Sequence, residues 1–344
     1  MRVAALIDPH RRGAADFARE AERLGVDSLW VPEVWGYDAL TGLAHVAAHT
    51  TTIGLGTFVV QLGSRSPALL ATSALSLQSL SGGRFRLGVG VSGPQVMEGW
   101  HGVRFDRPVQ ATRETIEIIR MVSRGDTLDH PGQVYPLPLP DSQGRALRPM
   151  VEAATVAIYV AAMGPANLSL TGEVADGWLA NLFIPESAEV FLEPLRQGAA
   201  LAGRDLAELD LVAPVGVEVT VDDAAGAEAA RRHARGYAFT IGAMGSGSTN
   251  FYNNALTRMG YGPAVDEVER LWRAGRRDEA ADAVPVDLGQ LTNLVGTEAA
   301  IAARIEQYAR AGITTLLAKL DGALDVQLGT LATLVDLAAD TGPA

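Results

Sequence analysis

The chain has 344 residues, and its 40 acidic side chains outnumber its 28 basic ones, which gives a formal net charge of −12. This acidic balance, with no block of basic residues, argues against nucleic acid or anionic lipid as the main partner, because both require clustered Lys and Arg. The chain contains no cysteine, which excludes disulfides, thiolate nucleophiles and Cys-ligated metal centres. We therefore expect a small-molecule partner.

The first residues also argue against a targeting segment. Only a short apolar run precedes Asp8, too brief for the hydrophobic region of a signal peptide. No stretch of the sequence approaches the ~18 apolar residues of a membrane helix. We therefore expect a cytoplasmic protein without membrane contact. Lys319 is the only lysine, so Schiff-base chemistry is restricted to that position.

Short apolar segments alternate with segments of helical periodicity from the first residues onward, a pattern typical of βα units around a parallel sheet. In the first helical segment, Phe17, Ala21 and Leu24 lie on one face, and Gly25 follows as a C-cap. The predicted strands are 3–7, 28–31, 53–60, 85–91, 156–161, 178–182, 211–221 and 314–320. The predicted helices are 14–24, 40–48, 68–80, 111–122, 167–174, 188–202, 224–237, 299–311 and 326–339.

Two segments interrupt this alternation, one near 126–155 and rich in proline, the other near 240–290 and rich in small polar residues at its start. Eight strand candidates, each with a helix, predict a (β/α)8 TIM barrel in one domain over 1–344, with these segments as excursions. The alternative is an open, doubly wound sheet, which usually has fewer strands.

In a barrel, the residues that follow each strand line one mouth, and the candidate catalytic residues are sought there. His10 is a candidate acid or base because histidine titrates near neutrality, although a surface histidine is the simpler alternative. Glu33 and Trp35 place an acid and a large ring at a strand end, where the alternative is a helix N-cap region with a packing aromatic ring. For His101 the alternatives are likewise a functional role and a purely structural one. No His, Asp and Glu group has metal-ligand spacing, so we expect no metal.

Two glycine-rich turns add binding candidates. The segment 87–94 allows backbone to pass close to a flat ligand, because glycine lacks a Cβ atom. It is not the dinucleotide fingerprint, since Pro94 and a further loop come between the strand and the next helix. The segment 161–167 leads from a strand directly into a helix, whose N-terminal amides suit a phosphate. The alternative for both is a tight turn without a ligand.

Five motifs together resemble the bacterial luciferase-like family of barrel oxidoreductases. They occupy 24–31, 53–57, 80–90, 159–165 and 175–178, in order along the chain. Two further segments, 90–102 and 250–253, are similar to the coenzyme F420-dependent branch, which includes methylene-tetrahydromethanopterin reductase. Enzymes of the family that use flavin mononucleotide (FMN) share the same barrel. The resemblance implies a TIM barrel and coenzyme F420, with FMN as the alternative cofactor.

The resemblance also implies roles for individual residues. Glu33 corresponds to a polar group near the deazaflavin ring, and the segment 58–61 to a bulge with a non-prolyl cis peptide behind that ring. Val34 and approximately Gly93 stand where the sugar-phosphate dehydrogenases of this branch have His and Glu, which disfavours that substrate. The implied cofactor-binding residues are Glu33, Phe58, Val59, Val60, Gln61, Gly90, Val91, Ser92, Gly93, Ala162, Met163, Gly164, Pro165 and Asn181.

The implied reaction is hydride transfer between C5 of the deazaflavin and a small-molecule or modified-peptide substrate, as a reductase of an activated C=C or C=N bond. His10, Glu33 and His101 are the candidates for proton exchange, and Trp35 for a wall of the substrate site. The alternatives are an FMN-dependent monooxygenase that uses oxygen and a partner reductase, and a flavin-binding protein without turnover. The segment 242–252 is a candidate lid or subunit contact, and the resemblance implies a homodimer.

Overall fold

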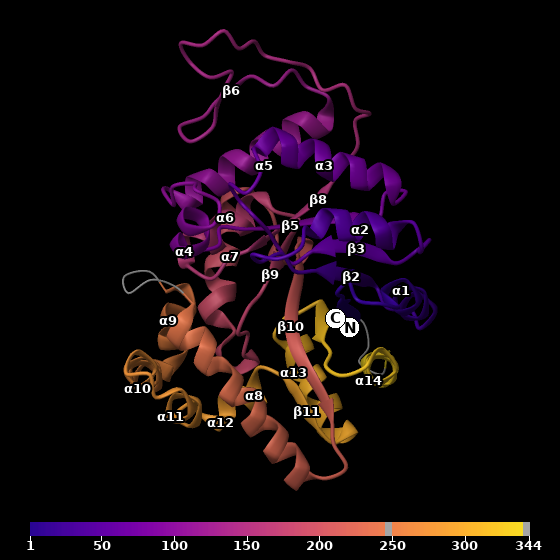
Figure 1. Ribbon diagram of the computed structural model, residues 1–344, viewed down its shortest axis with the longest axis vertical. Helices are drawn as coiled ribbons and strands as arrows, with labels where there is room; N and C mark the ends of the chain where they lie inside the picture. The colour runs from indigo at the N-terminus through magenta and orange to yellow at the C-terminus, as the bar shows by residue number, and fades with distance from the viewer. Residues whose placement is uncertain (245–249, 340–344) are drawn as a thin grey trace.

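The computed structural model describes residues 1–244 and 250–339, and in this part of the chain eight parallel strands close into a ring (Figure 1). β12 pairs with both β1 and β10, and β10 pairs in turn with β9, which closes the ring. The predicted (β/α)8 barrel is confirmed. Its strands are β1 (Arg2–Leu6), β2 (Ser28–Val31), β3 (Gly54–Thr57), β5 (Phe85–Gly90), β8 (Ala157–Ala161), β9 (Gly177–Leu179), β10 (Asp210–Val219) and β12 (Thr315–Lys319).

Helices surround the ring and start where the sequence favours a first turn. Proline occupies the first helical position of α3, α5 and α6, where its missing N–H costs no hydrogen bond. On α1, Phe17, Ala18 and Ala21 form the buried face. The helices around the barrel are α1 (Ala14–Arg23), α2 (Ala39–Ala47), α3 (Pro67–Leu80), α5 (Pro108–Arg124), α6 (Pro165–Val174), α7 (Glu189–Leu201), α13 (Glu298–Arg310) and α14 (Leu324–Ala339).

Alternate strand residues build two separate cores. Leu29 and Val31 of β2 pack outward against the helices, whereas Trp30 between them points into the barrel. The ring of Trp30 meets Tyr159 edge-on, with centroids 5.2 Å apart. The interior is therefore packed with side chains and is not a pore. Its buried members are Ala4, Trp30, Tyr159, Leu179, Val212 and Leu317.

The strand predicted over 53–60 is interrupted. β3 ends at Thr57, whose hydroxyl bonds both the N–H and the carbonyl of Gly88 on β5. The next peptide bond, Phe58–Val59, is cis, as the resemblance implied, and β4 (Val60–Gln61) then resumes the pairing with β5. A Cβ atom on Gly90 would lie 2.7 Å from Cγ2 of Val59, so glycine is required where the bulge approaches β5.

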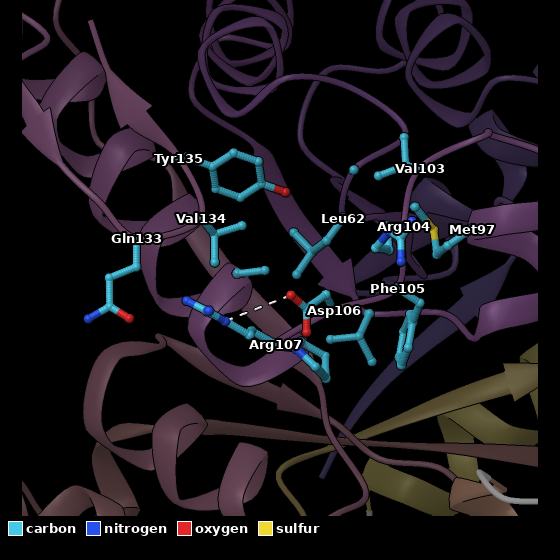
Figure 2. Close-up of a pocket in the computed structure, with 14 residues that line it drawn as sticks. Leu62, Met97, Val103, Arg104, Phe105, Asp106, Arg107, Gln133, Val134 and Tyr135 are labelled. Carbon is cyan, nitrogen blue, oxygen red and sulfur yellow. Dashed lines mark ion pairs between the residues drawn. The ribbon is translucent and has the colours of Figure 1, made fainter. Parts of the chain in front are cut away.

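The excursion near 126–155 is mostly irregular, but it contains a short hairpin of β6 (His130–Pro131) and β7 (Pro136–Leu137). A helix that was not predicted, α4 (Pro94–Gly99), follows β5. The loop between α4 and α5 faces the hairpin across a cavity of about 420 Å³ (Figure 2). In Figure 1 the excursion projects beyond α5 at one end of the molecule, and α8 to α12 gather at the other.

The second excursion is helical. α8 (Asp223–Ala243) runs past the predicted end at 237 because Ala238 and Ile241 are buried in a separate apolar core. The remaining elements are α9 (Phe251–Leu256), a π-helical turn (Thr257–Tyr261), α10 (Gly262–Arg273), α11 (Arg277–Asp282), α12 (Val286–Leu291) and β11 (Leu294–Gly296). Two short 3-10 turns, Pro185–Ser187 and Leu206–Glu208, flank α7. Residues 245–249 of the candidate lid lie outside the described residues.

β10 changes its neighbour along its length. It pairs with β9 over only three residues, Asp210 to Val212. Its pairing with β12 runs from Val212 to Gly216, and further along Val217 to Val219 pair with β11. The excursion therefore completes the barrel wall near the mouth.

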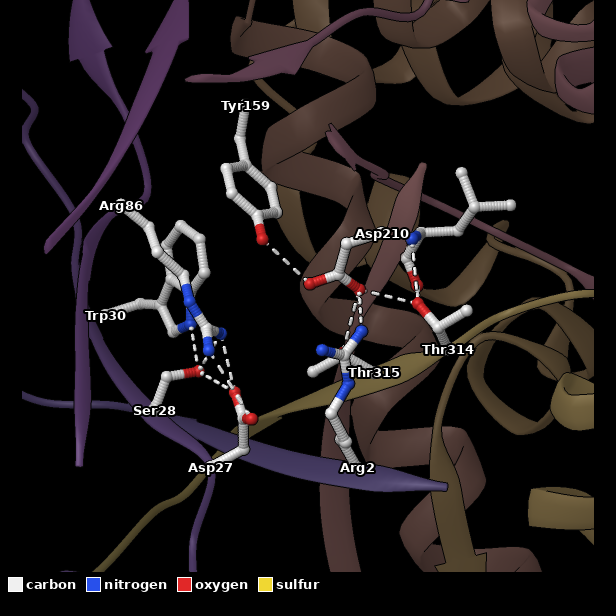
Figure 3. Close-up of polar contacts among 10 residues, drawn as sticks. Arg2, Asp27, Ser28, Trp30, Arg86, Tyr159, Asp210, Thr314 and Thr315 are labelled. Carbon is white, nitrogen blue, oxygen red and sulfur yellow. Dashed lines mark hydrogen bonds and ion pairs between the residues drawn. The ribbon is translucent and has the colours of Figure 1, made fainter. Parts of the chain in front are cut away.

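The opposite, N-terminal end of the barrel is closed by a polar network around Asp210 (Figure 3). Its carboxylate accepts hydrogen bonds from the hydroxyls of Tyr159 (2.9 Å) and Thr315 (2.9 Å) and pairs with Arg2 (2.7 Å). Burial, with the nearby Asp210 charge, raises the pKa of Tyr159, which stays a neutral donor. The network supplies hydrogen-bond partners to the buried polar groups at this end. In TIM barrels the N-terminal end contributes to the stability of the fold.

Glu22 on α1 provides a test of stability outside the mouth. Its carboxylate accepts the backbone N–H groups of Thr51, Thr52 and Ile53 before β3. Burial opposes the charge of Glu22, but these bonds outweigh it and lower its pKa to about 2. The stability that the ionised Glu22 adds to the folded state is therefore complete above the unfolded-state pKa of ~4.3 and is lost as the pH falls towards the folded-state pKa of about 2. Replacing Glu22 with Gln is expected to cost ~1–2 kcal/mol at pH 7.

Denaturant unfolding at pH 7 and at pH 3 measures the effect. The loss in Glu22→Gln should shrink at pH 3, where the wild type has already lost part of this contribution. Glu20→Gln on the same helix is the control, because within the described residues the Glu20 side chain bonds the exposed Arg23 alone. Equal stability of Glu22→Gln and Glu20→Gln at pH 7 would contradict the prediction.

None of the helices in the described part of the chain combines the length and the apolar character that a membrane span requires.

Candidate active site

The floor of the barrel mouth is apolar. Phe58 and Val59, on either side of the cis peptide, are half-buried and pack on the interior core. Leu6 at the end of β1 and Ala161 at the end of β8 extend the same surface. These side chains come from three sides of the ring and leave a surface on which a flat ring system can lie.

Glu33 follows β2 and is fully engaged by protein groups. Both of its carboxylate oxygens accept hydrogen bonds from Arg65, each at 2.8 Å, and one also accepts the backbone N–H of Ala39 at the start of α2. Arg65 also pairs with Asp38, and the bond to Glu33 raises the pKa of Arg65. The Glu33 side chain is only 7 % exposed. The arrangement fixes the loop between β2 and α2.

Arg65 follows the predicted third strand, but nothing in the neighbouring sequence identifies it as the partner of Glu33. The partner of a carboxylate 32 residues away leaves no local sequence pattern.

Gln61 connects this loop to His101. Its buried side chain donates from Nε2 to the carbonyl of Glu33 (3.4 Å), and its Oε1 lies 2.6 Å from Nε2 of His101. With this amide orientation Oε1 is an acceptor, so Nε2 of His101 is the donor of this bond and Nδ1 is the ring nitrogen left for a ligand. The structure thus brings together three predicted residues, Glu33, Gln61 and His101.

His10 lies at the outer rim. Its exposed ring stacks on Tyr37, with centroids 4.0 Å apart and planes inclined by 24°. Trp35, on the same loop as Tyr37, is 50 % exposed. His10 and Trp35 therefore border the mouth on the side of β1 and β2, and His10 does not join the network of Gln61 and His101. Tyr37 had not been singled out from the sequence.

The turn at 162–165 ends at the N-terminus of α6. Gly164 is the N-cap residue, carries no capping side chain and faces open space. The turn is held from below by Trp178, whose Nε1 donates to the carbonyl of Ala162 at 2.9 Å. The first amides of α6 are therefore available to a ligand, as predicted for a phosphate.

Arg258 of the second excursion completes this corner. Its Nη2 donates to the carbonyl of Met163 at 2.5 Å, next to the free amides, and its Nε to the carbonyl of Asn254. Burial lowers the pKa of Arg258, but an arginine stays charged at neutral pH. This cation was missed in the sequence, because it lies 95 residues from the turn that it contacts and in a segment without a motif.

The turn after β5 and the end of β9 supply the remaining candidates. Ser92 has a left-handed backbone with φ of 59°, and Gly93 is the N-cap of α4. Asn181 follows β9 and is half-buried, and its side chain forms no hydrogen bond within the described chain. No cluster of three or more His, Asp or Glu in residues 1–244 and 250–339 is arranged to hold a metal ion.

Comparisons with known proteins show the family and the fold. The sequence profile of the luciferase-like monooxygenase family matches residues 3–315. A Mycobacterium tuberculosis protein assigned to the coenzyme F420-dependent oxidoreductases is 38% identical over 322 residues, which cover 91% of this chain and 92% of that protein. The 5,10-methylenetetrahydromethanopterin reductase of Archaeoglobus fulgidus is 28% identical over 306 residues, covering 88% and 87% of the two chains.

The solved structures support the fold. The coenzyme F420-dependent tetrahydromethanopterin reductase from Methanopyrus kandleri superimposes with a TM-score of 0.78, at 21% identity and with 98% of each chain covered. At that identity the match demonstrates the barrel alone. The profile match and the mycobacterial relative confirm the predicted family, and the chain is a member of the luciferase-like monooxygenase family of oxidoreductases.

Proposed function

We propose that the protein is a coenzyme F420-dependent oxidoreductase that transfers a hydride between the deazaflavin and a small organic substrate. The observation that carries the proposal is the corner at Gly164, where the N-terminus of α6 has no capping side chain and faces open space, and where Arg258 donates to the carbonyl of Met163. The names of the two curated relatives support the choice of cofactor.

The residues of the mouth fit such a cofactor. Phe58 and Val59 offer an apolar surface for the ring, and the amides after Gly164 with Arg258 offer a site for the phosphate. Gly90 lets the bulge come close enough to β5 for that surface to form. The bound deazaflavin supplies the hydride or accepts it at C5. The protein supplies orientation and a water-excluding floor.

His101 is the best placed of the predicted proton-exchanging groups. It is half-buried and held by Gln61, two residues after the cis peptide, whereas His10 stacks on Tyr37 at the rim. Both carboxylate oxygens of Glu33 are occupied by Arg65. We therefore place proton exchange at Nδ1 of His101 and assign Glu33 to positioning of the β2–α2 loop.

For the substrate we propose an activated C=C or C=N bond in a small molecule or a modified peptide, reduced by the deazaflavin. Val34 and Gly93 lack the side chains that the sugar-phosphate dehydrogenases of this branch use, so sugar phosphates are not expected to react. Incubating the protein and reduced F420 with candidate compounds, and following the return of the oxidised deazaflavin spectrum, tests this choice. A homodimer is proposed from the family resemblance alone, and sedimentation velocity tests it.

The cofactor is tested by titrating purified apo-protein with coenzyme F420 and, separately, with FMN while Trp fluorescence is followed. Selective micromolar binding of F420 is the expected result. Tight binding of FMN alone, with oxygen consumption in the presence of a reductase, would replace the proposal with a monooxygenase. Binding of neither cofactor would leave only the fold and the family.

Arg258 provides a prediction for the same titration. Arg258→Gln is expected to weaken F420 binding about tenfold, because one charge-assisted bond to the phosphate is lost, whereas the neutral amide corresponds in reach to Nε of Arg258, which donates to the carbonyl of Asn254. Arg270→Gln on α10 is the matched control, since Arg270 is exposed and Glu267 is its one ion-pair partner among the described residues. Equal affinities of the two variants, both with wild-type melting temperatures, would remove Arg258 from the site.

A further inference from the structure

The cavity of about 420 Å³ beside the mouth has no role in the site described above (Figure 2). Of its 14 lining residues, only Val91 belongs to the segments assigned to the cofactor. Leu62, on its inner side, directly follows Gln61, whose amide holds His101. A ligand in the cavity would therefore lie next to the cofactor and next to the proposed proton-exchanging group. Its volume is within the range of small-molecule sites.

The outer wall of the cavity is a rigid loop. Glu114 of α5 is 1 % exposed, and its carboxylate accepts the backbone N–H groups of Gln133, Val134 and Tyr135 at 2.7, 2.9 and 2.7 Å. Burial opposes the charge of Glu114, but these bonds together lower its pKa, so it stays ionised at neutral pH. The wall is therefore held in place without a ligand, which lowers the entropic cost of binding.

The facing wall is the loop between α4 and α5. The backbone N–H of Phe105 bonds Oε1 of Glu98 (3.1 Å), and its ring lies 6.4 Å from that of Phe251 on α9, measured between centroids. The side chains of Met97 and Val103 extend an apolar interior, and Figure 2 shows them opposite Val134 and Tyr135. The cavity therefore suits a hydrocarbon or aromatic group.

The rim carries positive charge in an otherwise acidic protein. Arg104 and Arg107 are exposed, and the guanidinium of Arg104 has no hydrogen-bond or ion-pair partner within the described residues. Arg107 pairs only loosely with Asp106, at 3.7 Å. The planar guanidinium donates two parallel hydrogen bonds to a carboxylate, sulfonate or phosphate. An apolar interior below an unpaired guanidinium matches an amphipathic anion.

We propose that this cavity binds the distal end of the substrate, and that this end is an apolar group carrying an anion that Arg104 recognises. The identification of the ligand as the substrate rests on the proposed function, whereas binding of an amphipathic anion does not. The same anionic chemistry can also come from the tail of the cofactor. The test separates these two sources.

The probes are two fluorescent dyes with the same apolar body, anilinonaphthalene sulfonate, which is an anion, and N-phenylnaphthylamine, which is neutral. The wild type is expected to bind the anion at least about fivefold more tightly than the neutral dye. Arg104→Gln should remove this preference and leave the affinity for the neutral dye unchanged. Arg231→Gln is the control, because Arg231 is exposed on α8 outside the cavity. Ala111→Leu, which fills the cavity from α5, should weaken both dyes.

The titrations are then repeated with saturating coenzyme F420. Unchanged binding of the anion supports a substrate site beside the cofactor. Displacement of the anion by F420 would assign the cavity to the cofactor and overturn the proposal, as would equal affinities of wild type and Arg104→Gln for the anion. If F420 does not bind the protein at all, the proposed function fails, while the comparison of the two dyes still decides whether the cavity takes an amphipathic anion.

Discussion

Gly164→Val is expected to weaken the binding of coenzyme F420 about 100-fold, because the new side chain occupies the open space at the N-terminus of α6 and separates the phosphate from the N–H groups of Ala166 and Asn167. The backbone of Gly164 has a φ of −80°, which valine adopts, so the variant should fold. Fluorescence titration with F420 measures the affinity, and circular dichroism verifies the fold.

Gly236→Val is the matched control for this variant. Gly236 is exposed on α8 and also faces open space, so the same substitution adds the same bulk away from the mouth. Its affinity for F420 should equal that of the wild type. A folded Gly164→Val protein that binds F420 normally would take the 162–165 turn out of the cofactor site.

With a substrate that the protein is found to reduce with F420, His101→Ala is expected to lower kcat about 100-fold. The dissociation constant of F420 should stay nearly unchanged. A positioned acid or base contributes at least this factor, and His101 does not contribute to the apolar floor or the phosphate corner. Steady-state rates and fluorescence titration with F420 measure the two quantities.

Two further variants separate the roles of the histidines. His10→Ala should retain normal kcat, because the His10 ring is stacked on Tyr37 at the rim. Gln61→Leu should lower kcat less than His101→Ala, since it removes only the hydrogen bond that orients the imidazole. A normal rate in His101→Ala together with a slow His10→Ala would move proton exchange to the rim.

The barrel could be predicted from local sequence because each βα unit carries its own signals. Apolar runs bounded by glycine, and a proline such as Pro67 at a helix start, depend on residues a few positions apart. The cis peptide at Phe58 followed from resemblance to a family, since no local propensity indicates a cis bond at this position. The end of α8 could not be predicted. The glycine-rich sequence near 242 favours a loop, but burial of Ile241 in the separate apolar core extends the helix to Ala243.

The electrostatics of the site could be predicted only in part. Glu33 and Gln61 could be placed at the mouth because each follows a predicted strand. Their partners, Arg65 and His101, could not be paired with them in this way. The bond from Arg258 to the Met163 carbonyl spans 95 residues and depends on how the second excursion folds. Such pairs form in three dimensions between segments with no periodic relation, so only a structure brings them together.

The short pairing of β9 with β10 has a consequence for how this enzyme can diversify. Beyond Val212 the rim is completed by β11, and the segment from α8 to α12 keeps its own apolar core. Substitutions within that core can reshape one side of the opening while the ladder of β12 with β1 and β10, which closes the ring, is left intact. Selection for new substrates can therefore act on the side of the rim next to β10 without weakening the scaffold.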